Sequence, residues 1–207
     1  MFKITSPIIE KLEDKKYSKI INKNNICEKS FKAETIDLSY SEEINSCKFN
    51  KVVFINTILN RFSMVDIIFE NCNLSNVTFI DSTIHRVVFK NCKLVGTSFV
   101  NCSLQNILIE DCLCNYINLS SDKMKYILVK NSSFIESSFI ENKLKEVEFD
   151  NINFTGSEFN NTSLKDIDLS NSNINNLRIN LYDLRGVIID SYQSMELIGL
   201  LGVKIKE

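Results

Sequence analysis

Residues 69–94 read FENCNLSNVTFIDSTIHRVVFKNCKL, and every fifth residue of this stretch is large and apolar. The same phase holds from Phe49 to Ile189 over 29 positions, with Cys114 as the only smaller residue. Neither an α-helix, with its period of 3.6, nor a β-strand, with its period of 2, produces such a pattern. A fixed repeat over this length indicates a stacked architecture.

A second inward-facing side chain precedes most of these centres by two residues. Val52, Val77 and Cys92 are examples, and they are usually smaller than the centres themselves. Residues two apart in an extended segment point to the same side. Each five-residue unit therefore predicts one short extended side with two inward groups, followed by a corner.

A longer period of twenty residues lies within the period of five. An asparagine or aspartate recurs at Asn71, Asn91, Asp111, Asn131, Asn151 and Asn171. Charge alternates at the same interval through Glu70, Lys90, Glu110, Lys130 and then Asp150. Four units therefore close one coil, and successive coils stack at ~4.8 Å, the spacing of paired strands. This register predicts asparagine ladders and Glu–Lys pairs between neighbouring coils.

These repeats resemble those of the pentapeptide-repeat proteins over residues 44–190. The resemblance implies an all-β fold, a right-handed quadrilateral parallel β-helix of about seven coils, with a short C-terminal α-helix. An out-of-phase stretch from Phe31 to Leu38 predicts an imperfect first coil. We expect an N-terminal arm or cap at 1–26, the solenoid at 27–190, and a C-terminal helix and tail at 191–207, which is a candidate dimerisation element.

Composition excludes several classes of function. The net charge is −2, and no apolar run is long enough to cross a membrane. The first residues lack a secretory apolar region, so we expect a cytoplasmic protein. Six cysteines occupy inward positions and are interpreted as small buried residues rather than disulfides or metal ligands, while Cys27 is a candidate exposed thiol. The six are Cys47, Cys72, Cys92, Cys102, Cys112 and Cys114.

The sequence predicts no enzyme activity and no cofactor. Five glycines cannot form a phosphate-binding glycine motif. The single histidine, His85, follows a core centre, so we expect it to point outward as a solvated residue without a catalytic or zinc partner. Acidic pairs on a convex surface lack the burial that raises a carboxyl pKa for acid–base catalysis.

One side of the predicted solenoid carries an apolar stripe on its outer surface. The stripe consists of Ile68, Val88, Leu108 and Leu128, each one residue before a centre. Exposed apolar patches usually have a cover or a partner. Either residues 1–26 fold over the stripe, through Ile8, Ile9, Leu12, Ile20 and Ile21, or a partner protein binds there. The first interpretation is favoured.

Charge divides the solenoid along its axis. Residues 48–130 carry a net charge of +3 and residues 131–190 carry −5. The candidate acidic face for a partner consists of Glu110, Asp111, Glu148, Asp150, Asp168 and Asp190. A column of bases, which acids flank, predicts a mixed surface rather than direct nucleic-acid binding. This basic column consists of Lys125, Lys145, Lys165 and Arg185.

Both ends of a solenoid need caps. Ser6-Pro7 is typical of a helix start, and an extended arm is the alternative. Residues 191–201 predict a short helix with Ser191 as its N-cap and Gly202 as its stop. The candidate interface of a two-fold homodimer is the apolar set Met195, Leu197, Ile198, Leu200, Leu201 and Val203.

The C-terminal end resembles that of the quinolone-resistance pentapeptide proteins. The matching residues are Gly186-Val187, Asp190, Tyr192-Gln193 and Leu201-Gly202. The resemblance implies a head-to-head dimer whose acidic rod imitates duplex DNA and binds the type II topoisomerases DNA gyrase or topoisomerase IV. This chain departs from that pattern in having no obvious projecting loop and a less acidic surface. The alternative hypothesis is an interaction scaffold that uses the apolar stripe or the basic column.

Overall fold

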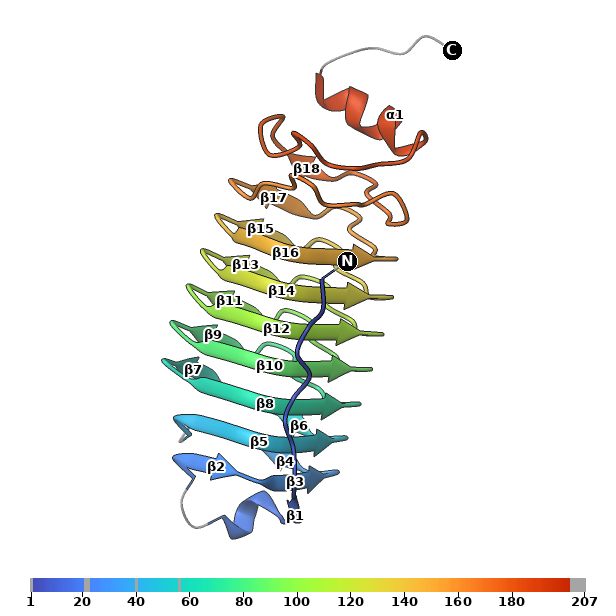
Figure 1. Cartoon of the computed structure of the whole chain (residues 1–207). Helices are drawn as coiled ribbons and strands as arrows, with labels where there is room; N and C mark the ends of the chain where they lie inside the picture. The colour runs from blue at the N-terminus through green and yellow to red at the C-terminus, as the bar shows by residue number, and fades with distance from the viewer. Residues whose placement is uncertain (1, 21–22, 40, 56, 202–207) are drawn as a thin grey trace.

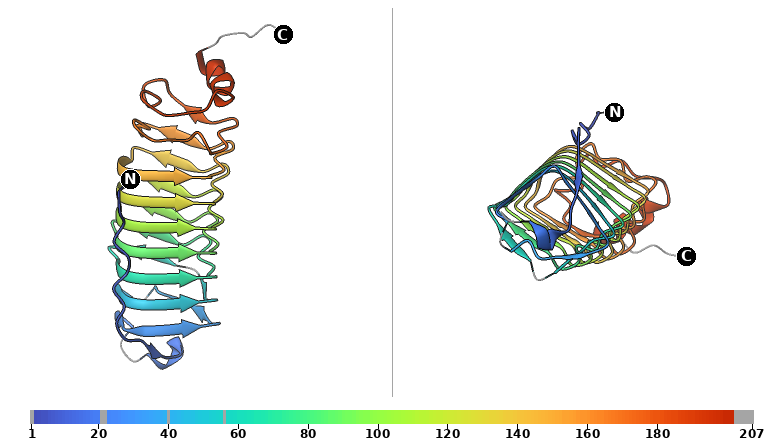
Figure 2. Two further views of the ribbon diagram at one scale, coloured as in Figure 1. Left: turned by 45° about the vertical axis from the view of Figure 1, so that its right-hand side comes forward. Right: turned by 90° about the horizontal axis from the view of Figure 1, so that it is seen from below.

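The computed structural model describes residues 2–20, 23–39, 41–55 and 57–201. The chain winds into a right-handed, four-sided parallel β-solenoid of about eight turns, as the sequence predicted (Figure 1). Viewed along its axis, the solenoid is a square tube (Figure 2). Every strand pairing within it is parallel, because each coil repeats the direction of the coil before it.

Long strands form one wall of the tube and turn its corner at mid-strand. They are β5 (Glu43–Asn50), β8 (Ser63–Glu70), β10 (Thr83–Lys90), β12 (Ser103–Glu110), β14 (Lys123–Lys130) and β16 (Lys143–Asp150). Three short strands precede them in the same sheet, β1 (Glu13–Asp14), β2 (Asn25–Cys27) and β3 (Lys29–Lys32). We call this nine-stranded sheet sheet A.

The remaining walls are built from shorter pieces. A seven-stranded sheet contains β7 (Ile58–Asn60), β9 (Thr78–Ile80), β11 (Ser98–Val100), β13 (Asn118–Ser120), β15 (Ser138–Ile140), β17 (Glu158–Asn160) and β18 (Arg178–Ile179). A third stack begins with β4 (Thr35–Ile36) and β6 (Val53–Phe54) and continues as single bridges to Asn173. The helical elements are η1 (Tyr17–Lys19), α1 (Gln193–Ile198) and η2 (Gly199–Leu201).

The register of the coils is twenty residues, as predicted. Lys90 pairs with Glu70 on one side and with Glu110 on the other, and Lys130 continues the column to Asp150. The first coil is shorter, because β3 and β5 pair with an offset of eighteen residues, as in Ser30 with Lys48. That offset explains why the earliest apolar residues are out of phase with the rest.

The corners of the tube have a left-handed backbone at intervals of five residues. Asn71, Asn91 and Asn131 lie at φ of 54°, 52° and 45°, and Gly96 and Gly156 occupy the same kind of position. Asparagine and glycine tolerate this region better than most residues. The asparagine column therefore reflects corner geometry as well as stacking. Among the described residues, the only Asn–Asn hydrogen bond in this column joins Asn151 Nδ2 to Asn131 Oδ1, at 2.9 Å.

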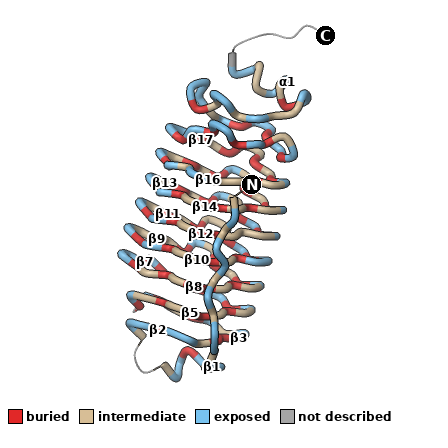
Figure 3. Tube along the Cα trace, in the orientation of Figure 1, coloured by how far each residue is buried: buried red, intermediate tan, exposed pale blue. Residues whose placement is uncertain are grey.

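The core is a column of stacked side chains inside the tube. Buried residues recur along successive coils (Figure 3). The rings of Phe31, Phe49, Phe69 and Phe89 stack with centroids 5.0, 5.0 and 5.1 Å apart. Each ring buries apolar surface against the coil above and below, so stability depends on neighbouring coils. The six inward cysteines are buried and unpaired, and Cys27 is exposed. Burial raises the pKa of Cys47 and Cys102 to about 11.

Both end segments differ in detail from the expectation. Residues 2–12 form no helix after Ser6-Pro7 and instead run as an extended arm along the outside of sheet A (Figures 1 and 2). Proline lacks an N–H and favours extended neighbours, which suits such an arm. At the other end, α1 is capped by Tyr192 rather than by Ser191, and η2 completes it. Gly202 lies outside the described residues.

Candidate functional site

The N-terminal arm is fixed to one corner column of sheet A. The backbone N–H of Ile8 donates to Asp66 Oδ1 at 2.8 Å, and that of Thr5 donates to Asn106 Oδ1 at 3.0 Å. Near its tip, the Phe2 ring lies 6.1 Å from the Tyr126 ring. Between Asp66 and Tyr126 the arm therefore follows the corner across four coils.

A partly buried ion pair strengthens this attachment. The guanidinium of Arg86 binds both carboxylate oxygens of Asp66 at 2.6 Å. Burial opposes the charged form of Asp66, but hydrogen bonds from Arg86 and the N–H of Ile8 outweigh it and hold its pKa below the ordinary value. The expectation of a solvated His85 was wrong. Its ring is half-buried beside Asn106, and burial and the adjacent Arg86 lower its pKa.

The apolar stripe is aligned as predicted. Ile68, Val88, Leu108 and Leu128 pair in sequence, and Glu148 ends the column. All four stripe residues are half-buried. The arm runs over the same strands with Ile9 and Leu12 half-buried, whereas Ile8 is exposed. Ile20 packs against the core, and Ile21 lies outside the described residues. The arm therefore lies on the same strands as the stripe, and its hydrogen bonds reach corner residues two positions before it.

The six residues of the predicted acidic face are in different environments. Glu110 binds Lys90 Nζ at 2.7 Å, and Asp111 is exposed at the next corner. Asp190 accepts the backbone N–H of Gln193, while Gln193 Nε2 donates to the carbonyls of Leu169 and Ser172 and so closes the tube. Nothing in the sequence pattern indicated that Asp190 supports this cap.

The other three acids gather at one end of sheet A. Glu148, Asp150 and Asp168 line a hollow of about 800 Å³ together with Glu146 and Asp166. One lysine, Lys165, shares the hollow, and the Phe2 side chain reaches it from the arm. Five carboxylates beside one ammonium group therefore make this hollow acidic.

The hollow exists because two consecutive coils separate here. We call the gap between β16 and residues 163–170 the slit. Among the described residues, no strand pairing or backbone hydrogen bond joins 143–151 to 163–171. Asp150 accepts a hydrogen bond from Asn171 Nδ2 at 2.6 Å across the end of the slit. Residues 163–170 instead bond to the following coil, as in Asp166 N–H to the Gly186 carbonyl at 3.0 Å.

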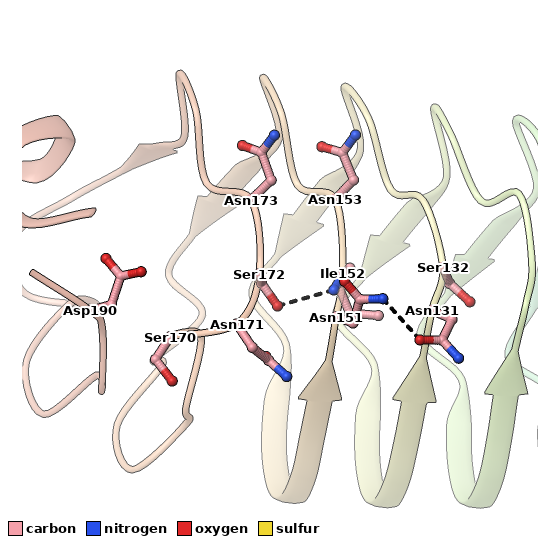
Figure 4. A pocket seen from close by; sticks show the side chains of 10 residues that line it. All are labelled: Asn131, Ser132, Asn151, Ile152, Asn153, Ser170, Asn171, Ser172, Asn173 and Asp190. Carbon is pink, nitrogen blue, oxygen red and sulfur yellow. Dashed lines mark hydrogen bonds between the residues drawn. The ribbon is translucent and has the colours of Figure 1, made fainter. Parts of the chain in front are cut away.

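An amide-lined trough continues from the acidic end of the slit (Figure 4). Asn131, Asn151 and Asn171 form its corner, and Asn153 and Asn173 line the adjoining wall. Asp190 lies at the far end of the trough. Amide side chains both donate and accept hydrogen bonds, so the trough is polar.

The basic column is interrupted by its surroundings. Lys125 and Lys145 pair in register, and Lys125 Nζ lies 4.7 Å from the centre of the Tyr126 ring. Lys165 lies in the slit beside the carboxylates. The column therefore does not form a uniform positive wall.

Apolar side chains are exposed at the C-terminal end of the rod. Met195 is 56 % exposed and Leu200 38 % exposed, and Tyr192, Ile188 and Leu181 are exposed nearby. Of the remaining predicted interface residues, Leu197 packs against the core and Ile198 is half-buried. The Leu201 side chain and Val203 lie outside the described side chains.

One buried acid lies inside the tube, at Asp122. Its side chain is 0 % exposed, and Oδ1 accepts the backbone N–H of Cys102 at 2.6 Å. Oδ2 has no hydrogen-bond partner. Burial raises the pKa of Asp122 from its ordinary value of 3.8 to about 7. The missing partner of Oδ2 is visible only in the structure.

Two kinds of site are absent from the part of the chain that the structure describes. No group of three or more His, Cys, Asp or Glu side chains is placed to hold a metal ion. No described helix is long and apolar enough to cross a membrane. What the wall of sheet A offers is an acidic, partly apolar slit between two coils.

Family models match most of the solenoid. A pentapeptide repeat region model matches residues 42–119 and 62–139, and a model of eight pentapeptide repeats matches residues 132–171. The chain therefore belongs to the pentapeptide-repeat family. No curated protein sequence matches it.

Solved structures share the fold at low sequence identity. A trypsin-treated variant of QnrB1, described as a plasmid-mediated fluoroquinolone resistance protein, is 20 % identical with a TM-score of 0.58, covering 94 % of this chain and 97 % of its own. HetL, a protein involved in heterocyst differentiation regulation from the cyanobacterium Nostoc sp. strain PCC 7120, is 18 % identical with a TM-score of 0.27, covering 82 % and 84 %. The first likeness confirms the fold alone.

Proposed function

We propose that this protein is a non-enzymatic interaction protein that binds a type II topoisomerase, DNA gyrase or topoisomerase IV, by presenting carboxylates where DNA presents phosphates. The observation that carries the proposal is the cluster of Glu146, Glu148, Asp150, Asp166 and Asp168 on one wall, with Lys165 as the only base among the described residues that line the hollow. A protein surface that binds phosphates attracts such a row of carboxylates for the same electrostatic reason.

Two further observations support this choice. The chain follows the fold of QnrB1, a fluoroquinolone resistance protein, over nearly its whole length. The arm lies across the strands of sheet A that carry the stripe, whereas only its Phe2 end reaches the acidic hollow, so the stripe is less available to a partner than the carboxylates are. The alternative scaffold function, through the stripe or the basic column, has less support for that reason.

A homodimer through the C-terminal end is part of the proposal. Met195 on α1 and Leu200 on η2 expose large apolar side chains at the end of the rod. Exposed apolar surface of this kind usually has a partner. A two-fold axis there would bury them in both copies and join two rods end to end. Sedimentation of the full chain at micromolar concentration tests the dimer, and a single species near the chain mass of 23.8 kDa would contradict it.

The decisive experiment is a gyrase binding and supercoiling assay, run with and without a fluoroquinolone. The wild-type protein should bind gyrase and should restore supercoiling in the presence of the drug. Asp150→Lys with Asp168→Lys should weaken both effects. The matched control is Glu136→Lys with Glu141→Lys, which changes the charge equally at exposed corners outside the hollow. Equal loss in both variants would contradict a specific acidic face.

A further inference from the structure

The slit exposes the edge of a strand that is paired elsewhere in the solenoid. β16 pairs with β14 on one side and with no strand on the other among the described residues. One series of corner residues shows the interruption clearly, since Asn91, Asp111 and Asn131 each donate a backbone N–H to a carbonyl one coil further on. Asn151 is next in this series and makes no such bond. An unpaired edge of eight residues is a template for an added strand.

The floor of the slit is apolar. Leu144 and Val147 are half-buried, although the equivalent residues one coil earlier, Met124 and Ile127, are buried. Ile167, from the other side of the slit, completes the floor. Core positions that coil stacking normally covers are therefore open to a ligand here.

The rim of the slit selects the charge of that ligand. Glu146, Glu148 and Asp150 follow one edge, and Asp166 and Asp168 follow the other. Side chains of an extended segment alternate between two faces. A segment that placed apolar residues on the floor would direct the residues between them toward the rim.

We propose that the slit binds an extended segment of a partner protein, with apolar residues alternating with Lys or Arg, as an added strand along β16. Backbone hydrogen bonds to the edge supply affinity, and the apolar floor and carboxylate rim supply specificity. The inference deepens the proposed function, because it uses the same carboxylates, and it rests on that function only for the identity of the partner.

A labelled peptide tests the proposal directly. The probe has about ten residues, long enough to follow β16, and alternates Val or Ile with Lys. Fluorescence anisotropy with the full chain should show saturable binding, and Glu148→Lys with Asp168→Lys should weaken it at least about tenfold. The variant with Glu136→Lys and Glu141→Lys should bind like the wild type. A peptide with Glu in place of Lys should not bind.

A second measurement separates strand addition from charge attraction. The same peptide, N-methylated at alternate residues, keeps its charge but loses half of its backbone donors, and it should bind at least about tenfold more weakly. Hydrogen exchange should show new protection within residues 144–151 when the unmethylated peptide binds. Equal binding of the methylated peptide, or protection elsewhere only, would overturn the proposal.

Three outcomes distinguish this inference from occupation of the slit by the chain's own tail and from the proposed function. The chain's own tail alternates Val203 and Ile205 with Lys204 and Lys206. If only a chain without residues 202–207 bound the peptide, the tail would be the occupant and the proposal would be overturned. If the peptide bound in the slit and gyrase did not bind the protein, the inference would stand and the proposed function would fall. If gyrase bound the protein and the peptide did not bind in the slit, the proposed function would stand and this inference would fall.

Discussion

Replacing Asp122 with asparagine should stabilise the protein at neutral pH. Asp122 belongs to an inward column in which its neighbours donate hydrogen bonds to backbone carbonyls. Ser82 Oγ donates to the Ile80 carbonyl at 2.8 Å, Asn142 Nδ2 to that of Leu119 at 2.9 Å, and Thr162 Oγ1 to that of Phe139 at 3.0 Å. A carboxylate cannot donate, which is why Oδ2 is left without a partner. An asparagine at 122 would have the shape and the donor that Asn142 already uses.

The size of the expected gain in the free energy of unfolding follows from the pKa of Asp122. Burial raises this pKa from 3.8 to about 7, and each pH unit between the two corresponds to about 1.4 kcal/mol. Because the folded state holds its proton more tightly than the unfolded state, stability falls as pH rises from about 4 to about 7 and then levels off. The charged carboxylate therefore costs about 4 kcal/mol above that range. Asp122→Asn should regain about that amount at about pH 8 and almost nothing at about pH 4.

Chemical denaturation of both proteins at several pH values provides the assay. The difference in the free energy of unfolding between Asp122→Asn and the wild type should grow with pH across the stated range. Asp168→Asn is the control, because Asp168 is exposed and hydrogen bonds from Ser170 lower its pKa, so it should give no such gain. A difference that is zero, or equally large at every pH, would refute the reasoning.

Three further predictions concern packing, thiols and the arm. Leu119→Phe extends the ring stack of Phe99 into an internal cavity of about 30 Å³. Thermal unfolding should show that the free energy of unfolding rises by about 1 kcal/mol. A lower free energy of unfolding would indicate that the core is overpacked. A thiol reagent should label Cys27 alone in the folded protein and all seven cysteines after denaturation; fast labelling of a second thiol would contradict the burial. Asp66→Ala removes the acceptor of the Ile8 N–H, so trypsin should cut after Lys11 faster than in the wild type; an unchanged rate would show that other contacts hold the arm.

The periodic part of the fold could be predicted because the repeat constrains it repeatedly. An apolar residue at every fifth position leaves one way to bury all of them, and the charge alternation through Glu70, Lys90 and Glu110 fixes the register. The left-handed corners were not foreseen, although the asparagines that occupy them were visible. Their recurrence could have indicated positive φ as well as side-chain ladders.

The slit could not be predicted, and the reason is physical. Residues 163–170 keep the five-residue phase, so nothing in their pattern distinguishes them from coils that pair on both sides. Their separation from β16 is visible only in the structure. The acids at 148, 150 and 168 were identified, whereas Glu146, Asp166 and the unpaired edge that unites them were missed.

Competition with duplex DNA tests the central claim most directly. DNA gyrase immobilised on a sensor surface is saturated with the protein, and a short duplex is then added at rising concentration. If the carboxylates of Asp150, Asp168 and their neighbours occupy phosphate sites, the duplex should displace the protein, and added salt should weaken both ligands in parallel. Simultaneous binding of the protein and the duplex, each at its full affinity, would contradict the account.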